Sequence, residues 1–157
     1  MRAAVLTVSD RAAAGRLADE SGPAVERLLA DAGFQVGTPA VLPDEPERVA
    51  EFLVAGAAHH DLLVTTGGTG LGPRDRTPEA TRRVIDYEVP GLAELMRSAG
   101  LAKTPMAALS RSLAGVRGRT LILNLPGSLA GATESLEAVL PALPHAVQLL
   151  RGDTQHR

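Results

Sequence analysis

The amino-acid sequence predicts an α/β fold with a mostly parallel sheet that helices cover on both faces. Segments typical of strands alternate with segments typical of helices along the 157 residues. Three of the strand-like segments, at residues 3–8, 61–66 and 119–125, are short apolar runs, as expected for strands buried on both faces. Together, the alternation and the apolar runs favour parallel strands joined by crossover helices over a sandwich of hairpins.

The strands follow from apolar runs and from the turn residues that bound them. Strands are expected, in order, over residues 3–8, 34–42, 61–66 and 119–125. The second is the weakest of these, because Gly37 and Pro39 interrupt it. Residues 11–20 are polar and rich in Ala and Gly, so we expect a loop there.

The helices follow from apolar residues at helical spacing and from proline or a capping residue at each start. Helices are expected to begin at Ser21, Pro46, Thr77, Pro90, Thr104 and Ser128. The first should end near Gly33, and the one from Thr77 should reach about Asp86. Pro141 and Pro144 should split the last helix.

Composition limits the classes of function. The chain is 45% hydrophobic and 22% charged, which predicts one soluble globular domain over residues 1–157 with a frayed tail at 155–157. A net charge of −2 and an aromatic content of 2% argue against nucleic-acid and membrane partners. No cysteine is present, and no apolar run has the length of a signal peptide or a membrane span, so we expect a cytoplasmic protein.

Polar and glycine-rich residues follow three of the predicted strands. In a parallel sheet the carboxyl ends of the strands meet on one rim, where ligands bind. The candidate binding residues on this rim are Ser9, Asp10, Thr66, Gly67, Gly68, Thr69, Gly70, Asn124, Pro126, Gly127 and Ser128. Four glycines within residues 67–72 can bring backbone N–H groups close to an anion, which predicts a phosphate site.

Charged residues follow the glycine-rich loop and modify this prediction. The loop contains no lysine and its glycine spacing is not G-x-G-x-x-G, so a P-loop or dinucleotide site is disfavoured. Arg74 could grip phosphate, and Asp75 could bind Mg²⁺ together with phosphate oxygens. The structural alternative is that Asp75 pairs with Arg74 or Arg76 on the surface.

Other candidates also have structural alternatives. Asp44 lies just before a predicted helix and could cap it. Thr77 and Pro78 are typical of a helix cap and a first helical turn. Ser110 and Arg111 could lie on a solvated helix face or bind substrate.

Several motifs resemble those of the molybdopterin adenylyltransferase family, the MogA and MoaB proteins of molybdenum cofactor synthesis. They are VSDR, VLPDE, TTGGTGLGPRDRTPEAT, LSRSLAGVRG and NLPGS, which occur in this order over nearly the whole chain. The resemblance implies a three-layer α/β/α fold with a mixed sheet, one edge strand of it antiparallel, and a homotrimer. It also implies a reaction: with Mg²⁺, AMP passes from ATP to the phosphate of molybdopterin, pyrophosphate leaves, and the product goes to a molybdate-inserting protein.

The resemblance also assigns residues. Asp44 and Asp75 match the two carboxylates that matter in the family, and we expect both to serve catalysis and Mg²⁺ binding. We expect residues 67–72, Arg74 and the helix start at Thr77 and Pro78 to bind phosphates. Ser110, Arg111, Asn124 and Ser128 are candidates for the pterin or the nucleotide. Arg76 departs from the small apolar residue of many relatives.

Three other functions compete with this one. The chain could be a carrier that binds molybdopterin without catalysis, as in MoaB-type members with doubtful activity. It could be a trimeric scaffold whose site has decayed. It could also be a general nucleotide-binding or nucleotide-hydrolysing protein. Some MoaB-type members with doubtful activity lack the carboxylate that matches Asp75, so its presence here favours the transferase.

Overall fold

A seven-stranded mixed sheet forms the centre of the computed structural model, which describes residues 1–153. The order is β2-β1-β4-β7-β6-β5, and β3 also pairs with β1. The strands are β1 (Arg2–Val8), β2 (Gln35–Val36), β3 (Ala40–Leu42), β4 (Leu62–Thr66), β5 (Tyr87–Glu88), β6 (Ala114–Arg117) and β7 (Thr120–Leu125). The mostly parallel sheet predicted from the sequence is confirmed, because β2, β1, β3, β4 and β7 are parallel.

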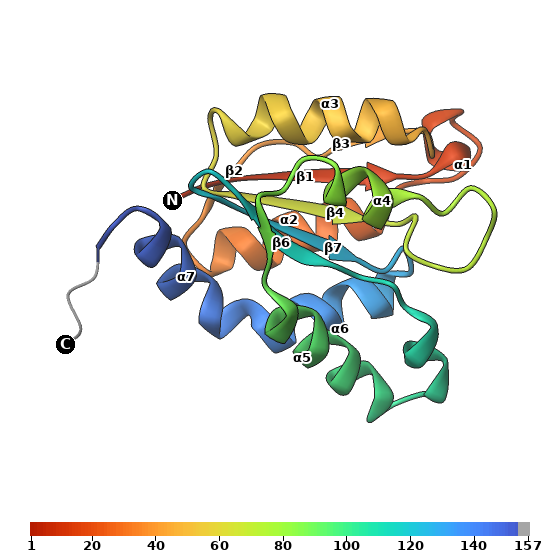
Figure 1. Cartoon of the computed structure of the whole chain (residues 1–157). Coiled ribbons are helices and arrows are strands. Elements are labelled where there is room, and N and C mark those ends of the chain that lie inside the picture. The colour runs from red at the N-terminus through yellow and green to blue at the C-terminus, as the bar shows by residue number, and fades with distance from the viewer. Residues whose placement is uncertain (154–157) are drawn as a thin grey trace.

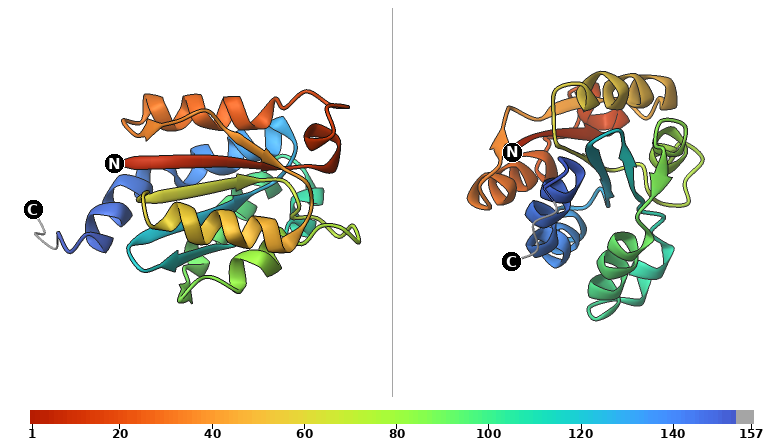
Figure 2. Two further views of the ribbon diagram at one scale, coloured as in Figure 1. Left: turned by 90° about the horizontal axis from the view of Figure 1, so that it is seen from above. Right: turned by 60° about the vertical axis from the view of Figure 1, so that its left-hand side comes forward.

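Helices cover both faces of the sheet, which gives three layers (Figure 1). They are α1 (Asp10–Ala13), α2 (Ser21–Asp31), α3 (Pro46–Ala57), α4 (Thr77–Arg82), α5 (Pro90–Leu101), α6 (Leu129–Val139) and α7 (Leu143–Leu150), with 3₁₀ turns η1 (Pro105–Leu109) and η2 (Leu140–Ala142). One layer holds α3 and α4, and the other holds α2, α5, α6 and α7 (Figure 2).

The three central strands are buried on both faces because each alternates between two apolar clusters. Val5, Val64 and Leu123 face the layer of α2, α5, α6 and α7. Leu6 and Leu63 face α3 and α4 on the other side. This double burial explains why the sequence shows continuous apolar runs at these strands. No helix of residues 1–153 is both long and apolar enough to cross a membrane.

Several predicted boundaries are wrong. The strand expected at 34–42 is two strands, β2 and β3, separated by residues 37–39. The loop expected at 11–20 begins with the short helix α1, which the Ser9 side chain caps. The helix from Thr77 ends at Arg82, well before Asp86. The split of the last helix near its two prolines is confirmed. The tail predicted at 155–157 lies outside the described residues.

The antiparallel part of the sheet is larger than expected. The edge strand β5 pairs antiparallel with its neighbour β6, as predicted, and β6 in turn pairs antiparallel with β7. Neither β5 nor β6 was identified from the sequence. Because β6 runs antiparallel to β7, the turn that joins them lies at the edge of the sheet opposite the rim formed by the carboxyl ends of the parallel strands.

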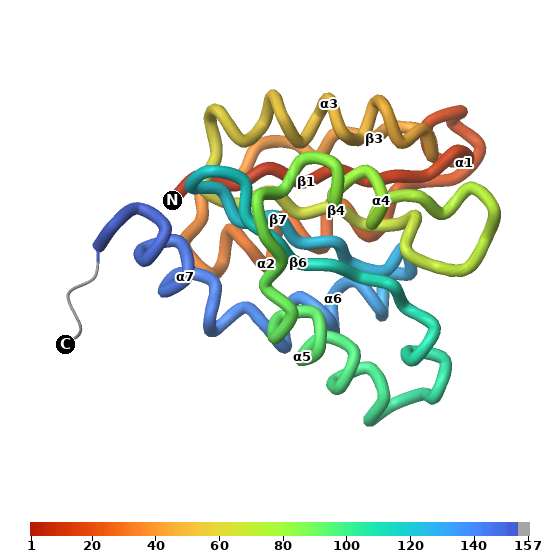
Figure 3. The backbone as a smooth tube through the Cα atoms, in the orientation of Figure 1, coloured from red at the N-terminus to blue at the C-terminus, as the bar shows by residue number. Residues whose placement is uncertain are grey.

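The carboxyl ends of the parallel strands lie on one side of the molecule, opposite the N-terminus (Figure 3). In the tube view, the yellow-green loop that follows β4 projects from this side next to α1. The connections after β1, β4 and β7 therefore meet, as the sequence predicts for parallel strands.

Candidate active site

The glycine-rich loop after β4 has a backbone that only glycine adopts without strain. Gly67 and Gly68 have φ of 92° and 68°. A Cβ at Gly67 would lie 2.2 Å from the carbonyl oxygen of Val8, and one at Gly68 would lie 2.2 Å from Oγ1 of Thr77. The loop can therefore pass between the end of β1 and the start of α4 only because these two residues lack side chains.

Asp44 and Asp10 hold two segments of the rim together. The amide of Asp10 donates to Oδ2 of Asp44, and the amide of Asp44 donates to Oδ1 of Asp10, each at 3.0 Å. The predicted cap role of Asp44 is wrong, because no side chain caps α3. Burial raises the pKa of Asp44, and the neighbouring carboxylates of Asp10 and Asp75 raise it further, against a lowering by the Asp10 amide. Asp44 is thus a carboxylate that a cation would stabilise.

Arg74 reaches across the mouth of this region to Asp10. Its Nε and Nη2 donate to the two oxygens of the Asp10 carboxylate at 2.6 and 2.9 Å. The hydrogen bond from Arg74 lowers the pKa of Asp10. Arg74 therefore links the loop before α4 to the start of α1, and a phosphate would have to compete with Asp10 for its guanidinium.

Asp75 pairs with neither Arg74 nor Arg76 among the described contacts. Its Oδ2 accepts a hydrogen bond from the amide of Gly72 at 2.9 Å, and its own amide donates to the Gly72 carbonyl at 3.0 Å. These two bonds close a tight turn. Oδ1 accepts no hydrogen bond from residues 1–153 in the structure, so it is available to a ligand.

A cavity of about 600 Å³ opens on one side of the glycine loop. We call it the acidic cavity, because Asp19, Glu20, Asp44 and Asp75 line it, against a single basic side chain, Arg11. A phosphate placed there would meet these carboxylates, so its binding would require a cation as well.

Buried hydroxyls and one carboxylate form a hydrogen-bonded network in the wall of the acidic cavity. Thr7 donates to Asp19 at 2.8 Å and accepts from Thr66 at 3.4 Å. Thr66 also lies 3.0 Å from the Ser21 hydroxyl, and Asp19 accepts from the amide of Gly22 at 3.0 Å. The network joins β1, β4 and the first turn of α2, so this wall is fixed.

A second cavity of about 600 Å³ opens on the other side of the loop. We call it the apolar cavity, because Met96, Met106, Leu109 and several small residues of α5, η1 and α6 line it. Lys103 and Glu134 form an ion pair of 2.9 Å between two of its sides. Both cavities are lined by Gly68, Asp75, Gly127 and Ser128. The structure thus presents two binding volumes that share one polar rim.

Comparison with known proteins decides the family. Residues 4–145 match the family described as "Probable molybdopterin binding domain". The chain belongs to the MogA/MoaB family of molybdenum cofactor biosynthesis proteins. It is 42% identical to a molybdopterin adenylyltransferase of Helicobacter pylori, over 95% of this chain and 87% of that protein. It is 37% identical to the molybdopterin adenylyltransferase of Escherichia coli, over 97% and 86% of the two chains.

Solved MogA and MoaB structures share the fold. A MoaB structure from Thermus thermophilus is 59% identical with a TM-score of 0.90 and covers 96% of each chain. A MogA structure is 44% identical with a TM-score of 0.91, over 96% of this chain and 99% of that one. Some relatives are longer: the chain spans 47% of the bifunctional molybdenum cofactor biosynthesis protein of Synechococcus elongatus, at 40% identity.

The structure brings most of the predicted MogA/MoaB site residues to the two cavities. The acidic cavity receives Ser9, Asp44, Thr66, Gly67, Gly68, Asp75, Gly127 and Ser128. The apolar cavity receives Gly68, Thr69, Gly70, Asp75, Ser110, Pro126, Gly127 and Ser128. Ser9 and Ser128 also accept a backbone hydrogen bond as the N-caps of α1 and α6.

The remaining predicted residues do not line either cavity. Asn124 is fully buried and donates to the hydroxyls of Thr65 and Thr81. Thr77 is buried, its hydroxyl has no hydrogen-bond partner, and no side chain caps α4, so its predicted cap role is wrong. Pro78 is confirmed in the first turn of α4.

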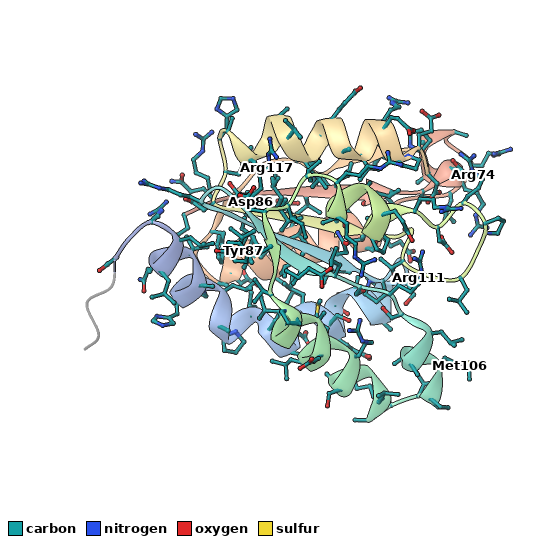
Figure 4. All side chains as sticks on the ribbon, in the orientation of Figure 1. Arg74, Asp86, Tyr87, Met106, Arg111 and Arg117 are labelled. Atoms are coloured by element: carbon teal, nitrogen blue, oxygen red, sulfur yellow. The ribbon has the colours of Figure 1, made fainter. Side chains whose placement is uncertain are left out.

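Three further predicted residues contact the loops rather than the cavities. Asp10 and Arg74 pair with each other, as described above. Arg111 lies outside any helix and bonds to the glycine loop, so its placement on a solvated helix face is wrong. Figure 4 shows Arg74 and Arg111 on the side of the molecule that also carries Met106, away from Asp86, Tyr87 and Arg117.

Sequence reasoning missed residues on both cavities. It assigned no role to Asp19, although a carboxylate three residues before an amide of a helix's first turn is a usual signal for capping. Met96, Met106 and Lys103 gave no signal, because they reach the apolar cavity only through the packing of α5 and η1.

Proposed function

We propose that this protein transfers AMP from ATP to the terminal phosphate of molybdopterin in a Mg²⁺-dependent reaction. The products are adenylyl-molybdopterin and pyrophosphate. The observation that carries the proposal is the pair of cavities that meet at Gly68, Asp75, Gly127 and Ser128. Two substrates bound on opposite sides of this rim would place their phosphates together, which is what group transfer between them requires.

The two carboxylates suit Mg²⁺. Asp44 and Asp75 line the acidic cavity and raise one another's electrostatic energy, as the upward effect of Asp75 on the pKa of Asp44 indicates. Residues 1–153 contain no group of three or more acidic or histidine side chains arranged as metal ligands. Mg²⁺ commonly takes one or two carboxylates and completes its shell with phosphate oxygens and water. When bound, it would neutralise the charge of the leaving pyrophosphate.

This charge distribution supports the following assignment of the substrates to the cavities. The triphosphate of ATP, with its metal, occupies the acidic cavity, because Asp44 lies only there. The ring system of molybdopterin occupies the apolar cavity, whose methionines and small residues suit a flat heterocycle.

The chain's own residues bind and orient the reacting groups. An oxygen of the molybdopterin phosphate forms a bond to the α-phosphorus, and the bond from that phosphorus to the oxygen bridging to the β-phosphorus breaks. The attacking phosphate is largely ionised at neutral pH, since its second pKa is about 6. It needs no general base. In this proposal the amides of residues 68–70 and of Gly127 stabilise the developing charge, whereas the amide of Gly67 already donates to the carbonyl of Leu125 at 3.0 Å.

The experiment is a pyrophosphate-release assay with the purified protein. Release that requires ATP, molybdopterin and Mg²⁺ together, with AMP recovered on molybdopterin by mass spectrometry, is the expected result. ATP turnover without molybdopterin would instead identify a nucleotide-hydrolysing protein.

A carrier is the second candidate, because the chain is more similar to the Thermus MoaB structure than to the adenylyltransferases compared above. Tight molybdopterin binding without pyrophosphate release would establish it. Under either function we propose a homotrimer that passes its ligand to a molybdate-inserting partner. Sedimentation and pull-down experiments test these two assemblies.

A further inference from the structure

The side chain of Arg111 makes four hydrogen bonds around the loop that carries Asp75. Its Nε donates to the carbonyl of Gly70 at 2.9 Å, and its Nη2 donates to the carbonyl of Asp75 at 2.6 Å. Nη1 and Nη2 both donate to the carboxylate of Glu79 in α4. The backbone amide of Arg111 also donates to the carbonyl of Thr69 at 2.9 Å. One residue thus contacts the beginning of the loop, its end and the helix that follows.

These contacts leave Arg111 little capacity to bind a substrate. A guanidinium has five N–H donors, and the four bonds above use four of them. A bidentate grip on phosphate needs two parallel donors, so it would break at least one bond to the loop. Ser110 lines the apolar cavity, whereas Arg111 does not. The geometry therefore separates the roles of two residues that are adjacent in the sequence.

We infer that Arg111 and Glu79 are positioning residues that fix the loop from Thr69 to Asp75 and so place the carboxylate of Asp75. This inference rests on the proposed function, in which Asp75 binds Mg²⁺ with the ATP phosphates. It changes the role of Arg111 from that of a ligand for substrate to that of a support for the metal-binding residue.

The loop conformation determines where the Asp75 carboxylate lies. Oδ2 accepts its hydrogen bond from the amide of Gly72, within the loop that Arg111 holds at both ends. A Cβ at Gly72 would lie 2.7 Å from this oxygen, so the carboxylate packs directly on the backbone. Any shift of the loop would move the carboxylate with it. Misplacement of a reacting group by about 1 Å is enough to slow catalysis by about a hundredfold.

Glu79 holds Arg111 in the orientation that reaches both carbonyls. Its hydrogen bonds from Arg111 lower the pKa of Glu79, so the pair is ionised at neutral pH. The two side chains are about one-third exposed, at 32% and 33%. A lysine at position 111 would keep the charge but could not bond to Gly70, Asp75 and Glu79 at once.

The first test measures the loop directly and does not depend on enzymatic activity. Hydrogen–deuterium exchange is followed over the amides of residues 69–76 in the wild type, Arg111→Lys, Glu79→Gln and Arg82→Ala. We expect these amides to exchange about tenfold faster in Arg111→Lys and Glu79→Gln than in the wild type, because the loop opens more often when its hydrogen bonds to Arg111 are weakened. Arg82→Ala, which also lies in α4, removes an ion pair with Glu88 of β5 and should exchange like the wild type.

The second test separates positioning from substrate binding. For the same variants, two kinetic quantities are measured: kcat, and the Mg²⁺ concentration that gives half-maximal pyrophosphate release. Molybdopterin binding is measured separately, without Mg²⁺ or ATP. We expect kcat to fall about tenfold or more, with a higher Mg²⁺ requirement and unchanged molybdopterin binding. The double variant Arg111→Ala with Glu79→Ala should be no worse than Arg111→Ala alone, because both changes break one unit.

Two results would overturn the inference. Unchanged exchange over residues 69–76 in both variants would show that the pair does not hold the loop. Weaker binding of molybdopterin or of metal-free ATP in Arg111→Lys, with normal kinetics in Glu79→Gln, would make Arg111 a substrate ligand. A wild type that releases no pyrophosphate would overturn the proposed function instead, and the exchange result would still stand.

Discussion

The two cavities beside the glycine loop are similar in volume and opposite in chemistry. Strand β1, α1 and the start of α2 supply the acidic cavity with carboxylates and hydroxyls that already bond to one another. Segments α5, η1 and α6 supply the apolar cavity with methionines, leucines and small residues. The walls of the acidic cavity are held by directed hydrogen bonds, whereas those of the apolar cavity are held by packing together with the Lys103–Glu134 ion pair.

Binding in the two cavities therefore has different requirements. Anionic phosphate in the acidic cavity is opposed by Asp19, Asp44 and Asp75 unless a cation accompanies it. A ring in the apolar cavity gains affinity from buried area and shape. Magnesium should therefore control one substrate strongly and the other weakly, and the rim shared by both cavities should be sensitive in every assay.

The largest effect is expected from Asp75, because its carboxylate lines both cavities. Asp75→Asn should reduce pyrophosphate release by about a hundredfold or more, since it removes charge at the proposed metal. Asp44→Asn should reduce it as well while leaving molybdopterin binding unchanged, because Asp44 lines only the acidic cavity. Titration of both substrates checks this, with Asp31→Asn on the exposed end of α2 as control. Near wild-type release in Asp75→Asn would remove its role as a metal ligand.

A paired substitution tests the assignment of substrates. Met106→Glu places a charge on the apolar cavity and should raise the KM for molybdopterin by about tenfold, with little change for ATP, because burying a charge under a ring is unfavourable. Leu149→Glu, on an exposed position of α7, is the matched control. Steady-state kinetics with each substrate varied in turn provide the measurement. A rise confined to the KM for ATP would reverse the assignment.

Gly68→Ala should distort the rim shared by both cavities and lower the stability of the fold. Its φ of 68° and the 2.2 Å approach to Thr77 leave no room for a methyl group. We expect the free energy of unfolding to fall by about 1–3 kcal/mol. Urea unfolding of this variant is compared with Gly91→Ala in α5, where a Cβ meets nothing within 4 Å. Equal stability of the two variants would contradict the crowding described at Gly68.

The smallest effect is expected at Thr77, whose buried hydroxyl has no partner. Thr77→Val replaces that hydroxyl with a methyl group of similar size. The free energy of unfolding should rise by up to about 1 kcal/mol, because an unsatisfied buried polar group is removed. Thermal unfolding without substrates measures this. A loss of stability would mean that the hydroxyl has a partner in solution.

The parallel half of the sheet was predictable and the antiparallel half was not. Strands buried on both faces appear as apolar runs, so β1, β4 and β7 could be identified. Strand β6 contains Gly115 and ends at Arg117, and β5 has only two residues, so neither has a pattern of its own. Strand pairing, rather than local preference, forms these two strands.

The rim of the site was predictable because it follows from the parallel strands β1, β4 and β7. The hydrogen bonds between the loops of the rim were not predictable. Parallel strands bring Ser9, Gly67 and Gly127 together whatever their side chains do. The contacts of Arg111 with Asp75 and Glu79 join residues 36 and 32 positions apart, through loops of irregular conformation. No spacing rule connects such positions, so the sequence alone does not distinguish a residue that positions the loop from a residue that binds substrate.

The position of β7 has a consequence for how the chain acquires its site. This strand lies between β4 and β6. Gly127, the second residue after it, packs against Gly67, since a notional Cβ at Gly127 would lie 3.2 Å from the Cα of Gly67. Hydrogen bonds at the sheet centre join residues 59 apart, such as Asn124 to Thr65. During synthesis, β4 therefore keeps an unpaired edge until residues 120–125 leave the ribosome. Binding competence therefore arises only after β7 has been synthesised, and shorter nascent chains expose an apolar strand edge that chaperones recognise.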